Sequence, residues 1–188
     1  MYQDKKELVV MQILPSLQSG GVERGTVDIA KALKKENIRS LVLSAGGSLT
    51  HQLTESEIRH ITLPVNSKNP FTIFSNIDKI ANIIKEYKVS VVHVRSRAPM
   101  WSAYFACKKT NTKLVSTVHG TYSLNLGIFK RFSPKVLYNS IMLKADSIIV
   151  VSNFIKEYLM TNYHKKNQPF PEETLKKISI IERGVDLD

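Results

Sequence analysis

Residues 8–23 have the sequence LVVMQILPSLQSGGVE, in which seven mainly apolar residues lead through two adjacent glycines into a polar segment. A short apolar run of this length is typical of a buried strand. Four apolar residues of the next segment, about 22–36, recur at helical spacing: Val27, Ile29, Ala30 and Leu33. We therefore expect a strand that passes through a glycine turn into a helix.

The alternation of strand and helix patterns continues along the chain. Further strands are expected at 40–43, 59–63, 89–94, 113–118, 147–151 and 178–181. Helices are expected at 49–56, 70–87, 99–109, 134–144 and 153–162, with loops at 119–133 and 164–173. Nearly all-apolar strands separated by helices indicate a parallel sheet covered on both faces. The prediction is an α/β fold, a Rossmann-like parallel sheet of about seven strands with helices on both faces.

The composition is that of an ordinary globular domain. The 188 residues, 43% hydrophobic and 23% charged, suffice for one domain with a buried core. No apolar run approaches the length of a membrane span, and the first residues lack the features of a signal peptide. The single cysteine, Cys107, excludes an internal disulfide and fits a reducing compartment. We expect a cytoplasmic protein.

The formal net charge is +11 and is uneven along the chain. Residues 1–94 carry 12 Lys or Arg against 9 Asp or Glu, and residues 95–188 carry 15 against 7. A basic half suggests an anionic partner such as phosphate, nucleic acid or an acidic membrane surface, or it serves solubility alone. The basic residues form no nucleic-acid recognition motif, so we expect no nucleic-acid partner.

The glycine loop after the first strand is the first candidate ligand site. Gly20 and Gly21 let the backbone approach a ligand and leave helix N–H groups directed at it, which suits a phosphate or a sugar hydroxyl. The alternative is a plain tight turn. The spacing fits neither the G-x-G-x-x-G dinucleotide motif nor a P-loop, because the glycines are adjacent and no G-K-[ST] follows.

Polar residues also follow the fourth and fifth expected strands. His93, Arg95 and Arg97 come at the end of the fourth, where the two arginines could point to one side and bind an anion, or lie in a solvated loop. His119 follows the fifth strand and precedes Gly120, so its imidazole could reach a sugar hydroxyl. Two histidines at neighbouring strand ends favour a functional site over a purely structural role.

The loop beginning at Tyr122 mixes aromatic and basic residues. Phe129 and Phe132 alternate with three cations, Lys130, Arg131 and Lys135. Such a mixture can lie on an anionic membrane. The alternative is a core-packing loop with exposed lysines.

Taken in order, the motifs resemble those of the N-terminal domain of family-4 retaining glycosyltransferases, which have the two-domain GT-B architecture. Five segments carry the resemblance, each beside the family pattern it is similar to: 19–23 (G-G-x-E), 91–94 (D-V-V-H-x-H), 115–120 (V-x-T-x-H-G), 145–152 (A-D-x-I-I-x-V-S) and 180–186 (I-x-N-G-V-D). Each motif is weak singly, but five in register cover nearly all of 8–188. Two positions depart from the pattern, since Arg183 stands for Asn and Arg95 for the second His.

The resemblance implies that 1–188 is the acceptor-side half of a GT-B fold, without the C-terminal domain that binds the nucleotide-sugar donor. It implies that Gly20 and Gly21 lie near the donor diphosphate and that His119 approaches the transferred sugar as the catalytic residue. Glu23 would support the loop or the acceptor. The enzyme would retain anomeric configuration without metal or cofactor, and the fragment alone would be inactive.

The remaining candidates for donor or acceptor binding are His93, Arg95, Arg97, Gly120 and Tyr122. The donor would be a nucleotide diphosphate sugar. The acceptor would be a saccharide or a lipid-linked molecule of the cell envelope, such as a lipopolysaccharide precursor, and the protein could be peripheral at the inner face of the membrane. Two alternatives stay open: a nucleotide-sugar epimerase of the same architecture, which needs carboxylates in the cleft, and a non-catalytic binding module.

Overall fold

The computed structural model describes residues 7–121, 134–163, 169–182 and 184. The strands are β1 (Val9–Ile13), β2 (Arg39–Ser44), β3 (Arg59–Thr62), β4 (Val91–Val94), β5 (Lys113–Val118), β6 (Ser147–Val150) and β7 (Ile178–Ile180). The α-helices are α1 (Gly21–Lys35), α2 (Thr50–Glu55), α3 (Pro70–Glu86), α4 (Arg97–Thr110), α5 (Pro134–Ser140), α6 (Asn153–Asn162) and α7 (Glu172–Leu175), and a 3₁₀ helix, η1, covers Ile141–Lys144.

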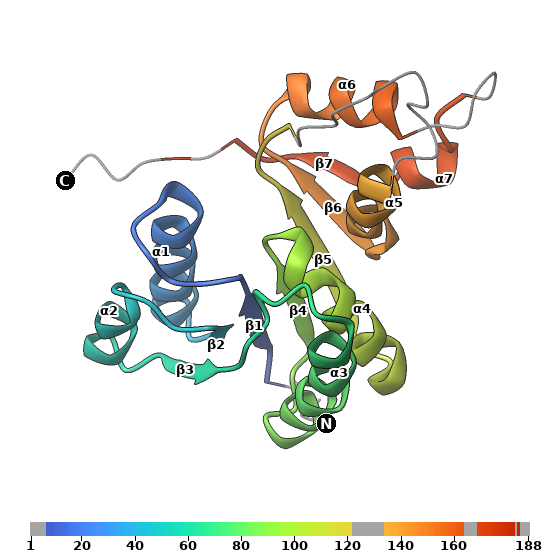
Figure 1. Ribbon diagram of the computed structural model, residues 1–188. Coiled ribbons are helices and arrows are strands. Elements are labelled where there is room, and N and C mark those ends of the chain that lie inside the picture. The colour runs from blue at the N-terminus through green and yellow to red at the C-terminus, as the bar shows by residue number, and fades with distance from the viewer. Residues whose placement is uncertain (1–6, 122–133, 164–168, 183, 185–188) are drawn as a thin grey trace, which may run out of the picture.

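The seven strands form one parallel sheet in the order β3-β2-β1-β4-β5-β6-β7 (Figure 1). This arrangement confirms the predicted Rossmann-like sheet. The order reverses between β1 and β4, where the chain crosses from one face to the other. Ligands of such sheets bind in the crevice at the carboxyl ends of the strands, at this switch point.

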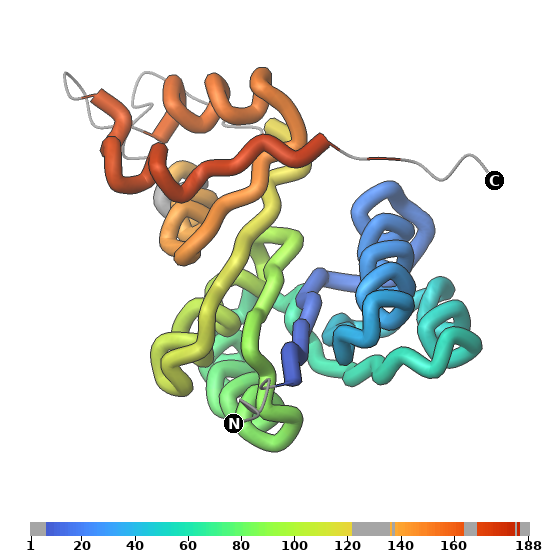
Figure 2. Tube along the Cα trace, turned by 180° about the vertical axis from the view of Figure 1, so that it is seen from behind, coloured from blue at the N-terminus to red at the C-terminus, as the bar shows by residue number. Residues whose placement is uncertain are grey.

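The two faces of the sheet have separate hydrophobic cores. On one face, α1 and α2 pack Val27, Ala30 and Leu53 against Leu14 and Val42. On the other face, the core takes buried residues from α3, α4, η1 and α6, such as Ile80, Met100, Met142 and Leu159. Because α1 and α2 stand at the β1–β3 end of the sheet (Figures 1 and 2), the described part of the α1-side core contains no residue of β4 to β7.

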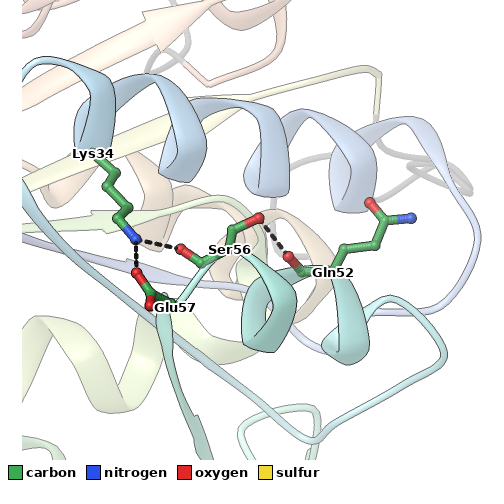
Figure 3. Close-up of polar contacts among 4 residues, drawn as sticks. All are labelled: Lys34, Gln52, Ser56 and Glu57. Carbon is green, nitrogen blue, oxygen red and sulfur yellow. Dashed lines mark hydrogen bonds and ion pairs between the residues drawn. The ribbon is translucent and has the colours of Figure 1, made fainter.

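Several helix boundaries follow from local chemistry. Asn69 accepts a hydrogen bond from the Phe71 N–H and Pro70 occupies the first turn of α3, as helix N-termini favour. Ser152 caps α6 by accepting from the Ile155 N–H at 3.3 Å, as the sequence indicated. At the end of α1, Lys34 Nζ donates to the Ser56 carbonyl at 2.8 Å and to Glu57 Oε2 at 2.6 Å, which ties this helix to the turn before β3 (Figure 3).

Three expectations about helices need correction. Helix α4 begins at Arg97, two residues before the expected start, because Pro99 is tolerated in a first turn whose N–H groups have no intrahelical acceptor. The single helix expected over 134–144 is α5 followed by the 3₁₀ helix η1. The loop expected over 164–173 ends in the short helix α7. Among the described residues, no helix is long and apolar enough to cross a membrane.

Candidate ligand site at the carboxyl ends of the strands

A row of polar side chains lies on the α1-facing side of the sheet. In β4, Val92 and Val94 belong to the opposite core, so the alternation of a strand turns His93 toward α1. By the same alternation, Val118 places Thr117 on the α1 side of β5. The row consists of these five residues: Gln12, His93, Arg95, Thr117 and His119.

The row opens into a hollow of about 290 Å³ between α1 and the part of the sheet that α1 does not cover. Residues of four regions line it: Gly25, Asp28 and Ile29 of α1; His93, Arg95, Thr117 and His119; Ile149 and Val151 of the β6 region; Ile181, Glu182 and Gly184. Ile29 was expected in a buried stripe, but it is 38% exposed because it borders this hollow. Apolar walls with a few convergent polar groups are the usual composition of a ligand site.

Arg95 is a buried cation at the base of the hollow. Its side chain is only 4% exposed, and its Nη1 donates to Gln12 Oε1 at 3.0 Å. Gln12 Nε2 in turn donates to the Thr26 carbonyl of α1 at 3.0 Å. This chain of hydrogen bonds joins β1, the end of β4 and α1, so the guanidinium is held in one place beneath the hollow.

His93 is held in the uncharged form. Burial, followed by the neighbouring charges of Arg95 and His119, lowers the pKa of His93 to about 3. Its Nε2 lies 2.7 Å from Thr117 Oγ1, a hydrogen bond whose direction depends on the tautomer. A neutral imidazole at this position can exchange a hydrogen bond with a ligand hydroxyl without adding charge.

The glycine loop precedes α1 as expected. Gly20 occupies the N-cap position of α1 in an extended conformation and provides no side-chain cap. A Cβ at Gly20 would meet the carboxylate of Glu23, which lies over the glycine in the first turn. The acid thus occupies the end of the helix where an anionic ligand would be favoured.

A second glycine pair, which the sequence analysis did not single out, shapes the first loop. Leu17 N–H donates to the Gly46 carbonyl at 2.8 Å, and Leu49 N–H donates to the Leu17 carbonyl at 2.8 Å. Gly47 has a φ of +150°, and a Cβ there would overlap the backbone of Leu17 and Gln18. The turn after β2 therefore supports the loop before α1.

The other predicted site residues are dispersed. Arg97 begins α4 and donates from Nη1 to Asn139 Oδ1 at 2.7 Å, so it does not extend beside Arg95 as strand alternation would require. Gly120 follows His119 directly, whereas Tyr122 and the membrane segment around Phe129 and Phe132 lie outside the described residues.

Polar residues that the sequence motifs did not indicate lie in the hollow and beneath it. Gln12 and Thr117 complete the row, and Asp28 and Glu182 add carboxyl groups. Gln12 had a usable signal, since it is the only polar residue between Leu8 and Leu14. Within the described segments, no group of three or more His, Cys, Asp or Glu could hold a metal ion.

The parallel seven-stranded sheet, with its polar row near the carboxyl ends of the strands, matches one half of a GT-B fold. The sequence profile of Glycosyltransferase Family 4 matches residues 19–188. The chain therefore belongs to glycosyltransferase family 4.

Known structures are consistent with this assignment. A glycosyltransferase from Rickettsia africae is similar over 96% of this chain, at 45% identity and a TM-score of 0.77. Anabaena HepE, solved in complex with UDP-glucose, is similar over 95% of this chain and 44% of its own chain, at 15% identity and a TM-score of 0.70. A UDP-N-acetylglucosamine 2-epimerase shares 15% identity over 93% of this chain and 48% of its own, with a TM-score of 0.59. At such identities the last two show the fold alone.

The chain spans 44% of the length of the Rickettsia africae protein. The comparison with curated protein sequences gave no match.

Proposed function

We propose that the chain is the N-terminal, acceptor-side domain of a retaining glycosyltransferase. The transferase would move a sugar from a nucleotide diphosphate sugar to a saccharide or lipid-linked acceptor of the cell envelope, in the cytoplasm or at the inner face of the membrane. The observation that carries the proposal is the meeting of His93, Arg95 and His119 in one hollow at the strand ends, in a chain of family 4. The domain that binds the donor would lie outside residues 1–188.

Each part of the site has a proposed role. Gly20 and Gly21 would lie near the donor diphosphate, at the N-terminal end of α1, whose dipole favours an anion. His119 reaches the transferred sugar, and Glu23 positions the loop or the acceptor. The charge of the leaving diphosphate is stabilised by helix N-termini and basic side chains, with no metal or cofactor.

The acceptor side contains the remaining predicted residues. Arg95 provides positive potential beneath the hollow, which suits a phosphorylated or carboxylated acceptor. His93 contributes a neutral hydrogen-bonding group. We also propose acceptor contacts for Arg97, Gly120 and Tyr122.

In a test, residues 8–182 of this chain are substituted for the matching part of the Rickettsia africae glycosyltransferase. The 45% identity favours correct docking of this segment on the other half of that protein. The chimaera is assayed with labelled nucleotide sugars and saccharide acceptors, and NMR assigns the anomeric configuration of the product. We expect transfer with retention. His119→Ala should lower kcat/KM by about 100-fold or more, while Phe154→Ala, an exposed residue of α6, should leave it unchanged.

The same assay separates the second candidate, a nucleotide-sugar epimerase. Asp28 and Glu182 line the hollow and would supply the acid and base that epimerisation needs. An epimerised nucleotide sugar formed without acceptor would establish this alternative, and an inverted glycoside would contradict the retaining mechanism. Turnover by the 188-residue chain alone would contradict the assignment of this chain to half of the active site.

A further inference from the structure

Helices α3 and α4 expose large aromatic side chains on the face of the sheet opposite the hollow. Phe71 is 86% exposed, Phe74 76% and Phe105 45%. Trp101 and Tyr104 of α4 are partly buried beside them. These five residues are called the aromatic surface below.

The two helices place these side chains next to one another. Lys109 Nζ of α4 lies 2.6 Å from Asp78 Oδ1 of α3, so these two positions face each other across the helix pair. Phe74 precedes Asp78 by four residues and Phe105 precedes Lys109 by four, so both rings lie one turn closer to the helix N-termini on the facing sides. Figure 1 shows α3 and α4 side by side.

Ring contacts extend the surface along α4. The Tyr104 and Phe105 rings meet edge to face with centroids 5.2 Å apart. Trp101 stands one turn before Phe105 and stacks on Tyr138 of α5, with centroids 5.9 Å apart. Phe105 is therefore backed by Tyr104, and Trp101 by Tyr138.

Lysines outnumber acids on and beside the two helices that carry the aromatic surface. Six lysines, at 68, 79, 85, 88, 108 and 109, stand against two acids, Asp78 and Glu86. Lys108 Nζ lies over the Tyr104 ring, 5.8 Å from its centroid, and Lys68 is exposed just before α3. Asp78, on the side of α3 that faces α4, is paired with Lys109.

We propose that the aromatic surface docks on an anionic lipid bilayer. Phe71, Phe74 and Phe105 would enter the interface, and Lys68 and Lys108 would meet the lipid phosphates. A protein partner fits less well, because lysine is depleted at protein interfaces and three exposed rings make a small contact area. The proposal does not rest on the proposed enzymatic function, and the test below measures lipid binding alone.

The chain contains its own reporter for the test. Trp101 is the only tryptophan and belongs to the aromatic surface, so its emission should shift to shorter wavelength when the surface enters lipid. The 188-residue chain is mixed with vesicles of phosphatidylcholine, with or without phosphatidylglycerol, and sedimented. We expect a shift and sedimentation with the mixed vesicles, and little of either with phosphatidylcholine alone.

Variants separate the aromatic from the electrostatic part. Substituting Phe71→Ser, Phe74→Ser and Phe105→Ser together should weaken binding by about 100-fold or more. Lys68→Gln and Lys108→Gln should each weaken it by about fivefold, and only for anionic vesicles. Phe154→Ser is the matched control, since Phe154 is 66% exposed on α6. Circular dichroism confirms that each variant is folded.

Three outcomes would overturn the proposal. One is a wild-type chain that does not bind anionic vesicles. Another is a triple variant that binds as the wild type does, or a Phe154→Ser variant that loses as much. The third is a wild-type chain that is a dimer and does not bind vesicles, together with a triple variant that is a monomer. A second copy of the chain would then cover the surface.

Discussion

His93 is the side chain whose ionisation shows how the hollow is built. Its pKa is lowered to about 3 by burial, by Arg95 and by His119, in that order. Burial and the adjacent guanidinium of Arg95 thus favour a neutral imidazole. The unfolded chain has no such constraint and takes up a proton at an ordinary pKa of about 6.5.

We predict that the free energy of unfolding decreases as the pH is lowered, because of this residue. The folded-state pKa of His93 is depressed, so the unfolded state binds the extra proton, and stability present above pH 6.5 is lost as the pH falls toward 3. At pH 5 the loss should be about 2 kcal/mol. Urea unfolding at pH 7.5 and pH 5 measures it. His93→Gln should lose about that much less than the wild type between the two pH values, and equal losses would contradict the assignment.

Gly47 gives a second prediction at the level of a residue. Gly47→Ala should lower the free energy of unfolding by about 2–3 kcal/mol, because its Cβ would overlap the backbone of Leu17 and Gln18 and its φ is +150°. The matched control is Gly46→Ala, whose φ is +87° but whose Cβ would enter open space. That control should cost about 1 kcal/mol. Equal losses in urea unfolding would show that the contact with the first loop is unimportant.

The elements are joined by side chains that the sequence motifs contain. Asp146, part of the A-D-x-I-I-x-V-S pattern, accepts a hydrogen bond from the Leu114 N–H at 2.8 Å through Oδ2. Its own N–H donates to the Leu114 carbonyl at 2.9 Å. The aspartate thus fixes the start of β5 against the start of β6. These contacts are structural, because they lie at the amino ends of β5 and β6 whereas the hollow lies at the carboxyl ends.

Asp146→Ala should therefore destabilise the sheet by about 1–3 kcal/mol, because the Leu114 N–H loses a charged acceptor. Asp146→Asn keeps an acceptor oxygen and should cost less. The Cys107 thiol serves as a check that each variant is folded. Its pKa is raised to about 12 mainly by burial and less by Asp146, so the thiol should stay unreactive toward Ellman's reagent in both folded variants. A loss in the asparagine variant as large as in the alanine variant would argue against this hydrogen bond.

The elements also show why most of the fold was predictable. Most strands are short apolar runs bounded by turns, so β1 was expected at 8–14 and is found at Val9–Ile13. Periodicity alone could not show that the helical pattern after Pro134 changes to a 3₁₀ helix at Ile141. The start of α4 was predicted wrongly from Pro99, because proline is accepted at several positions of a first helical turn.

The site was predictable in position but not in detail. Strand ends alone located His93, Arg95 and His119, which meet in the hollow. The direction of Arg97 could not be predicted, because it depends on whether the strand or the helix continues through Ser96. Gln12 acquires its importance only through contacts with Arg95 and Thr26, 83 and 14 residues away.

At the scale of the whole molecule, charge works against compactness. The net charge is +11, and the four ion pairs found between described residues are all at exposed positions, where such pairs contribute little. Self-repulsion of like charges should therefore lower stability at low ionic strength.

We predict that the unfolding midpoint in urea rises when the ionic strength increases from about 0.01 M to about 0.1 M, where the Debye length shortens from about 30 Å to about 10 Å. Changing Lys35 and Lys113, two exposed lysines outside these four pairs, to glutamine should reduce the dependence on salt. A midpoint that falls with added salt would show that attraction between charges prevails instead.

The strand order has a consequence for synthesis on the ribosome. β1 lies in the middle of the sheet, and its partner on one side, β4, pairs Val10 with Val91. Some 80 residues must be added after β1 before that neighbour exists, which at about 5–20 residues per second takes roughly 4 to 16 seconds. During this interval only β2 can pair with one edge of β1, so the nascent chain holds an apolar strand whose other edge has unpaired N–H and C=O groups in need of protection.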